Sequence, residues 1–152
     1  MKVCVQGLWH LGSVTAGCLA SLGHDVTGLD FDDQTIVNFE QGILPVDEPG
    51  LSALIEDGIT KGNLRFTGKV KDAVSGAQVL WITYDTPVDD DDKPDVDFVF
   101  RQVESTLPLL KENAVVVVSS QMPVGSIAQL EQLASRECPH KNLSFCSSPE
   151  NL

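Results

Sequence analysis

The most informative segment for the fold is Val3-Cys4-Val5-Gln6-Gly7-Leu8-Trp9-His10-Leu11-Gly12. Its first four residues form a short apolar strand, and the two glycines enclose a turn. A helix is expected next, because apolar residues recur at intervals of three or four and Gly23 then provides a stop. The predicted inward stripe of this helix is Leu11, Val14, Cys18 and Leu22. A strand, a glycine turn and a helix in this order are typical of the start of a doubly wound α/β domain.

The same alternation continues along the chain. Further strands are predicted over 25–29, 63–67, 77–83, 114–119 and 143–146. Further helices are predicted over 33–41, 51–59, 96–107 and 125–136, with Pro108 ending or kinking the third of these. Strands that are almost continuously apolar are buried on both faces. The sequence therefore predicts the α/β class, with a doubly wound, mostly parallel sheet of Rossmann type in a single domain over residues 1–152.

The charge balance narrows the classes of partner. The chain has 10 Lys and Arg against 22 Asp and Glu, a formal net charge of −12. Nucleic acids and anionic membranes are disfavoured as partners, because both are bound mainly through basic side chains. The start of the chain also lacks the features of a signal peptide. We expect a cytoplasmic protein, with the Asp89–Asp92 run forming a solvated loop.

The four cysteines predict neither a metal site nor disulfides. No two of them have the C-x-x-C spacing of a zinc site. Cys4 lies in the first strand and Cys18 on the first helical stripe, so both are expected in the core. A reducing compartment is the simplest setting for such a chain.

The glycine turn departs from the dinucleotide-binding fingerprint at one position. In G-x-G-x-x-G the first glycine makes a tight turn and the third lets helix and strand pack closely, as Gly7 and Gly12 would. The second lets the backbone approach a pyrophosphate, and here it is Trp9. The indole either turns away from the cofactor groove or blocks it. Asp30, after the second strand, suits the adenosine ribose hydroxyls and favours NAD over NADP.

Several segments beyond this turn share a more specific pattern. They are Met1-Lys2-Val3, Gly23-His24-Asp25-Val26, Gly28-Leu29-Asp30, Pro45-Val46-Asp47-Glu48-Pro49-Gly50-Leu51, Thr86-Pro87 with Pro94-Asp95, Met122-Pro123-Val124-Gly125 and Pro149-Glu150-Asn151-Leu152. In this order and spacing, they resemble the N-terminal domain of the UDP-glucose/GDP-mannose dehydrogenase family over essentially the whole chain.

The resemblance implies an activity for the intact protein. Members oxidise the C6 alcohol of a nucleotide sugar to a carboxylate with two NAD⁺, in polysaccharide biosynthesis. The first domain binds NAD, and a central helix and C-terminal domain bind the sugar and supply a nucleophilic cysteine. We therefore expect this chain to be the cofactor domain of a longer, dimeric protein and to be inactive alone.

The resemblance also assigns roles to single positions. The cofactor-binding residues it implies are Gly7, Trp9, His10, Leu11, Gly12, Asp30, Thr86 and Ser120. Gln121 stands where the family has a threonine that holds a catalytic water, and Glu150 matches a glutamate that assists hydrolysis of a thioester. Thr35 stands where the family often has a basic residue near the ribose.

Other functions are open on the sequence alone. One is a non-catalytic binding or scaffold module whose cofactor turn is filled by Trp9. Another is a Rossmann methyltransferase with an adenosyl cofactor, whose ribose Asp30 would also suit. Preference for S-adenosylmethionine over NAD⁺ would favour the methyltransferase, and failure to bind NAD⁺ would favour the scaffold.

Overall fold

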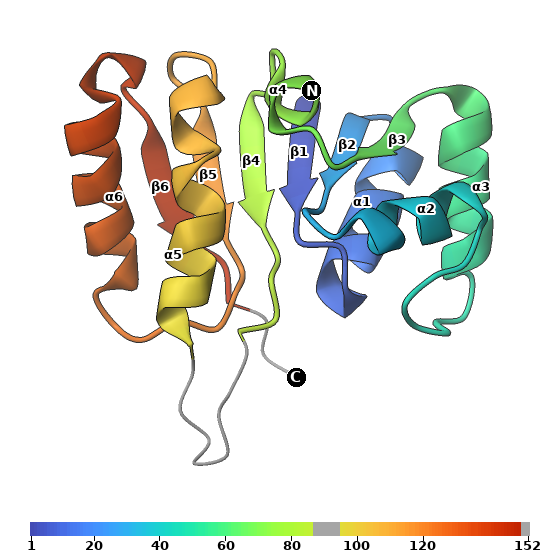
Figure 1. Ribbon diagram of the computed structural model, residues 1–152. Helices are drawn as coiled ribbons and strands as arrows, with labels where there is room; N and C mark the ends of the chain where they lie inside the picture. The colour runs from blue at the N-terminus through green and yellow to red at the C-terminus, as the bar shows by residue number, and fades with distance from the viewer. Residues whose placement is uncertain (87–94, 150–152) are drawn as a thin grey trace.

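The computed structural model describes residues 1–86 and 95–149, which form one six-stranded sheet covered by helices on both faces (Figure 1). The strands are β1 (Lys2–Gln6), β2 (Asp25–Leu29), β3 (Leu64–Thr67), β4 (Val79–Ile82), β5 (Val115–Val118) and β6 (Ser144–Ser147). The helices are α1 (His10–Ser21), α2 (Asp33–Glu40), α3 (Leu51–Lys61), α4 (Val70–Val74), α5 (Val96–Glu104) and α6 (Ser126–Glu137), with short 3₁₀ turns η1 (Leu107–Leu109) and η2 (Pro139–Lys141).

The sheet is entirely parallel, with strand order β3-β2-β1-β4-β5-β6. From β1 the chain builds outward to β2 and β3, and then crosses back to place β4 on the other side of β1. The predicted α/β class and doubly wound Rossmann-type sheet are thus confirmed. The reversal of direction beside β1 creates the crevice in which such folds bind ligands.

The alternation of side chains along the strands produces two cores. Cys4, Leu80 and Val116 are adjacent across β1, β4 and β5, and they belong to the core that α4, α5 and α6 cover. The neighbouring Val3 and Val5 point to the opposite core, which α1 and α3 cover. A strand buried on both faces has no polar side to display, which explains the continuous apolar runs in the sequence.

The predicted inward stripe of α1 was wrong for two of its four residues, whereas Val14 is half-buried and packs against the core. Cys18 is exposed, and Leu22 has 74% of its surface exposed. The buried face of α1 instead consists of small residues, namely Gly12, Ser13, Ala16, Gly17 and Ala20. Small side chains let α1 approach the sheet and α3 closely, which helical spacing of large apolar residues could not reveal.

Two other differences from the sequence prediction are local. The short helix α4 was not predicted. The helix predicted over 96–107 ends at Glu104, and Leu107 is buried in η1. Pro108 explains this early end, because its ring excludes the preceding residue from a regular helix. Cys4, by contrast, is fully buried as predicted, and burial raises the pKa of its thiol to about 12.

These burial differences predict how two leucines respond to truncation. Leu80 is fully buried in β4, so Leu80→Ala should lower the free energy of unfolding by about 2–5 kcal/mol. Leu22→Ala should change it by less than about 0.5 kcal/mol, because Leu22 is mostly exposed. Urea denaturation followed by circular dichroism measures both. Equal losses for the two variants would contradict the placement of α1.

Candidate cofactor-binding site

The two glycines of the β1–α1 turn are held in place by direct contacts. Gly7 has a φ of +99°, and a Cβ there would stand 2.8 Å from the Tyr84 ring. A Cβ on Gly12 would overlap the carbonyl oxygen of Gly7. That same oxygen accepts a hydrogen bond from the Thr83 hydroxyl at 2.7 Å. Both positions therefore require glycine, for the reasons that the sequence suggested.

The N-terminus of α1 presents unsatisfied backbone N–H groups to this turn. Trp9 is the N-cap residue, its side chain makes no capping hydrogen bond, and the first turn contains no acidic residue. By contrast, the carboxylate of Asp32 caps α2 and accepts hydrogen bonds from the backbone of Gln34 and Thr35. An uncapped N-terminus next to a glycine turn suits an anion such as a pyrophosphate.

Trp9 occupies the middle position of the turn with a φ of −87° and a ψ of −143°. Its φ is negative, so this position does not need the left-handed conformation that favours glycine. The side chain is 57% exposed and forms part of the wall of a cavity of about 430 Å³. That cavity is lined by Gly7, Leu8, Trp9, Asp30, Tyr84, Asp85 and Phe98. Space thus remains beside the turn with the indole in place.

Asp30 joins the end of β2 to the glycine turn. Its Oδ2 accepts a hydrogen bond from the Leu8 backbone N–H at 2.8 Å, and its Oδ1 accepts one from the Asp32 backbone N–H at 3.0 Å. Each carboxylate oxygen has a second lone pair, so both can still accept hydrogen bonds from ribose hydroxyls. Sequence reasoning predicted the ribose role and missed the structural one.

Three other predicted site residues meet between the ends of β4 and β5. The Thr86 hydroxyl donates to the Gln121 carbonyl oxygen at 2.7 Å, which ties the two loops together. Ser120 is 6% exposed, and its hydroxyl has no hydrogen-bond partner among the described residues. A second cavity of about 160 Å³ is lined by Leu11, Tyr84, Asp85, Thr86, Ser119, Ser120 and Gln121. The structure therefore brings the predicted Leu11, Thr86, Ser120 and Gln121 together.

His10 is positioned by a contact that the sequence did not reveal. Its Nε2 lies 2.8 Å from Oε1 of Glu48, in the loop between α2 and α3. The pair connects the first turn of α1 to the Pro45–Leu51 segment. Thr35, at the position where a basic residue would contact the ribose, instead donates to Asp32 at 2.8 Å.

The site contains two residues, Tyr84 and Asp85, that sequence reasoning did not single out. Burial raises the pKa of the Tyr84 hydroxyl, and its ring packs edge-on against Phe98 at a centroid distance of 5.5 Å. Desolvation raises the pKa of the Asp85 carboxyl, and the nearby His10 partly offsets that shift. Their position in the sequence was the available signal, since both residues lie just beyond the end of β4, after Thr83, at the crevice.

Two of the predictions lie outside the described residues. These are the catalytic assignment of Glu150 and the solvated loop at Asp89–Asp92. Within the described ranges, no three His, Cys, Asp or Glu side chains are grouped to hold a metal ion. No helix in that part of the chain is long and apolar enough to cross a membrane.

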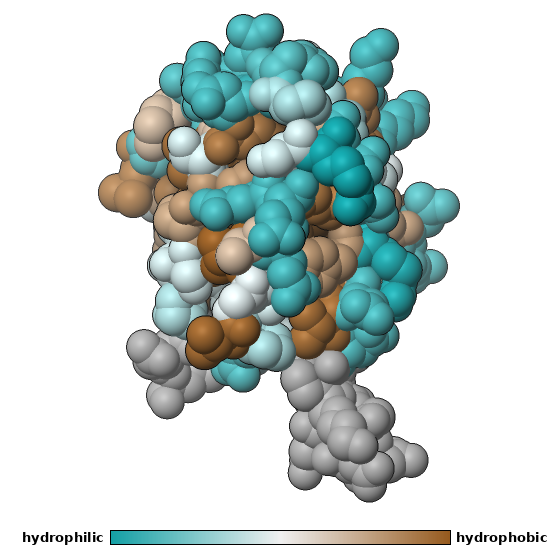
Figure 2. Space-filling view, turned by 90° about the vertical axis from the view of Figure 1, so that its left-hand side faces the viewer, coloured by the Kyte–Doolittle hydropathy of each residue, from teal (hydrophilic) through white to brown (hydrophobic). Residues whose placement is uncertain are grey.

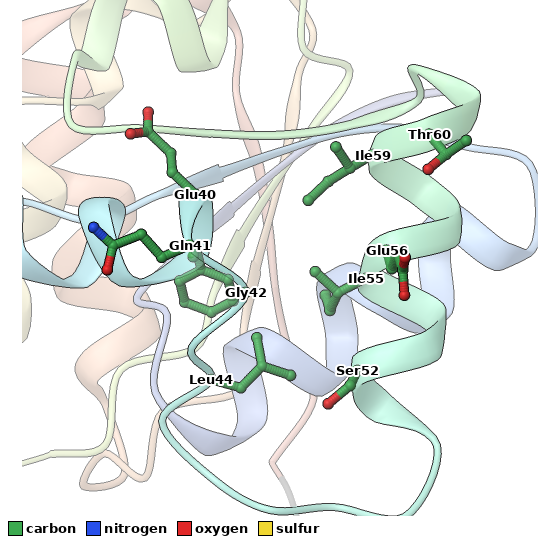
Figure 3. A pocket seen from close by; sticks show the side chains of 10 residues that line it. Glu40, Gln41, Gly42, Leu44, Ser52, Ile55, Glu56, Ile59 and Thr60 are labelled. Atoms are coloured by element: carbon green, nitrogen blue, oxygen red, sulfur yellow. The ribbon is translucent and has the colours of Figure 1, made fainter.

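Other hollows lie away from the glycine turn. A groove of about 340 Å³ between α2 and α3 has Leu44, Ile55 and Ile59 on its walls and Glu56 at its side (Figure 3). Another hollow adjoins the loop before α6, where Val124 is fully exposed. The face on the α6 side mixes apolar and polar groups, with apolar groups also near its lower end (Figure 2). Neither hollow contains Gly7 or Asp30.

The fold and these contacts together identify the class of domain. A parallel doubly wound sheet, a glycine turn at an uncapped helix N-terminus, and an aspartate at the end of the next strand form a dinucleotide-binding domain.

The comparisons with known proteins specify the family. Residues 1–152 match the NAD binding domain of the UDP-glucose/GDP-mannose dehydrogenase family, so the chain belongs to that family. It is 32% identical to the UDP-glucose 6-dehydrogenase of Rhizobium meliloti (strain 1021), over 100% of this chain and 35% of that protein. It is 35% identical to the GDP-mannose 6-dehydrogenase of Azotobacter vinelandii, over 84% of this chain and 30% of that protein.

Solved structures of similar proteins agree with this family assignment. The GDP-mannose dehydrogenase of Pseudomonas aeruginosa superposes with a TM-score of 0.89 at 31% identity, covering 100% of this chain and 36% of that one. The UDP-D-ManNAc dehydrogenase of Pyrococcus horikoshii gives a TM-score of 0.92 at 26% identity, covering 100% and 37%. The chain thus spans about a third of the length of the relatives it matches, and it is an NAD-binding domain.

The close contact between Gly7 and Gly12 predicts that one added methyl group at Gly12 lowers the stability of the fold. Gly12→Ala places a Cβ on the Gly7 carbonyl oxygen, so α1 must move off β1. We expect the free energy of unfolding to fall by about 1–3 kcal/mol, as in other overpacked sites. Gly68→Ala is the matched control, because its nearest non-neighbouring atoms are at 3.4 Å. Denaturant unfolding of both variants checks this, and equal stability of the two would contradict the contact.

The raised pKa of Asp85 predicts a pH-dependent effect on stability. A carboxyl whose pKa is higher when folded than when unfolded destabilises the fold once it ionises, and costs nothing below the unfolded pKa of about 3.9. Asp85→Asn should therefore be more stable than the parent at pH 7, and its advantage should disappear as the pH falls below about 4. Thermal unfolding across this range measures it. An advantage that grows toward acid pH would be the opposite of what this environment implies.

Proposed function

We propose that this chain is the cofactor-binding part of a nucleotide-sugar 6-dehydrogenase, which oxidises the C6 alcohol of a UDP- or GDP-linked sugar to a carboxylate with two NAD⁺. The observation that carries the proposal is the Asp30 carboxylate, 2.8 Å from the Leu8 N–H at the uncapped end of α1. The named activities of the relatives support the choice of substrate class.

In this proposal the adenosine half of the cofactor lies at the end of β2. Asp30 accepts hydrogen bonds from the ribose hydroxyls, and its charge repels the 2′-phosphate of NADP. The free N–H groups at the start of α1, from Trp9 to Gly12, hold the pyrophosphate. Trp9 forms one wall of the cleft.

The nicotinamide half lies at the ends of β4 and β5. When bound, NAD⁺ accepts the hydride from the sugar C6. Thr86 and Ser120 line this end, and the unpartnered Ser120 hydroxyl is available to hydrogen-bond the cofactor. The Gln121 side chain holds the water used in hydrolysis, with Glu150 assisting.

The chain spans about a third of the length of its relatives, so the proposal assigns the rest of the reaction to residues outside it. We propose that a central helix and a C-terminal domain bind the nucleotide sugar and provide the cysteine nucleophile. The intact protein is then a cytoplasmic homodimer without a nucleic acid or membrane partner. The 152-residue chain alone should bind cofactor and show no dehydrogenase activity.

The scaffold alternative requires Trp9 to close the turn. The observed geometry supports the opposite, because the indole is mostly exposed and a cavity of about 430 Å³ persists beside it. The family match over the whole chain likewise does not favour a module that has lost its cofactor, nor a methyltransferase.

Calorimetric titration of the chain with NAD⁺ tests the proposal. We expect binding in the micromolar to low-millimolar range, and weaker binding of NADP⁺. Asp30→Ala should weaken NAD⁺ binding by about ten- to a hundredfold, the value of one or two hydrogen bonds to a charged group. Asp57→Ala is the control, because that carboxylate pairs with Lys61 on α3.

Trp9→Gly separates the two readings of the turn. We expect it to change NAD⁺ affinity by less than about tenfold, because the Trp9 side chain is mostly exposed and a cavity remains beside it. If the parent chain binds no NAD⁺ and Trp9→Gly does bind it, the indole blocks the cofactor turn and the proposal is wrong.

A further inference from the structure

Asp85 stands where the two halves of the cofactor cleft meet. It lines both the cavity that contains Gly7, Trp9 and Asp30 and the cavity that contains Ser120. The residue before it, Tyr84, packs directly against Gly7. Asp85 therefore lies beside the turn and between the ends of the cleft to which the proposed function assigns the pyrophosphate and the nicotinamide.

The charges around this position are predominantly negative. Asp30 lies on the adenosine side of the cleft, and Glu48 is paired with His10. His10 lies close enough to influence Asp85, and its Nε2 is already paired with Glu48. A ligand that fills the cleft would displace water from Asp85 and strengthen its electrostatic influence.

The oxidised and reduced cofactors differ by one unit of charge at the nicotinamide end. The ring is cationic in NAD⁺ and neutral in NADH, whereas the pyrophosphate is the same in both. A carboxylate near the ring therefore attracts NAD⁺ and gives no such attraction to NADH. We propose that Asp85 is a specificity-determining residue that makes this cleft prefer NAD⁺ over NADH.

This inference rests on the proposed function, and it explains what a negative charge at Asp85 would contribute to the reaction. Two successive oxidations at one site require NADH to leave and a second NAD⁺ to enter. A site that binds the reduced form less tightly favours that exchange by mass action. Asp85 thus contributes to turnover without touching the sugar.

The test is a pair of titrations, with NAD⁺ and with NADH, on the 152-residue chain and three variants. Asp85→Asn should lower the ratio of the NADH Kd to the NAD⁺ Kd by about three- to tenfold, as expected for one partly screened charge. Asp85→Glu keeps the charge and should keep the ratio. Asp72→Asn removes a charge from α4, at the opposite end of the sheet (Figure 1), and should also leave the ratio unchanged.

The titrations distinguish a failure of this inference from a failure of the proposed function. If the parent chain binds both forms and Asp85→Asn changes both affinities by the same factor, Asp85 acts only on the pyrophosphate and the inference is wrong. An unchanged ratio in Asp85→Asn, or the same decrease in Asp72→Asn, overturns it equally. If the parent chain binds neither form, the proposed function fails first.

Discussion

The hydrogen bond from the Leu8 N–H to the Asp30 carboxylate is the interaction on which the rest of the site depends. It fastens the turn after β1 to the end of β2, and the close contact of Gly12 with the Gly7 carbonyl fastens α1 to the same turn. The first N–H groups of α1 are thereby aimed at the crevice. A single carboxylate links the two strands and still has acceptor capacity for a ligand.

The packing of α1 follows from the same constraint. A helix that begins in contact with the Gly7 carbonyl must lie close to the sheet, and only small residues fit along its inner face. A Cβ on Gly17 would already lie 3.3 Å from the Ile55 side chain of α3. Cys18 and Leu22 lie off this face and are exposed, while the larger Val14 and Leu19 pack against the core only in part.

The fold and the family could be predicted from the sequence, but the contacts within the candidate site could not. Periodicity and apolar runs predict the six strands, and the motif order predicts the family, because both depend on residue type alone. The inner face of α1 was wrong, because the rule that large apolar residues lie inside fails where helix and sheet are in close contact. The His10–Glu48 pair joins positions 38 residues apart, and no local pattern encodes such a contact. Asp85 was passed over for a similar reason, since its importance comes from lying between two cavities.

Hydrogen exchange of the backbone amides, with and without saturating NAD⁺, shows where the cofactor binds. We predict slower exchange in the presence of NAD⁺ at residues 7–13 and 84–86, where the glycine turn and the segment after β4 form the cleft. It predicts no change along the α2–α3 groove, which contains neither Gly7 nor Asp30. Unchanged exchange at the turn, or protection confined to that groove, would contradict the assignment of the cofactor to this crevice.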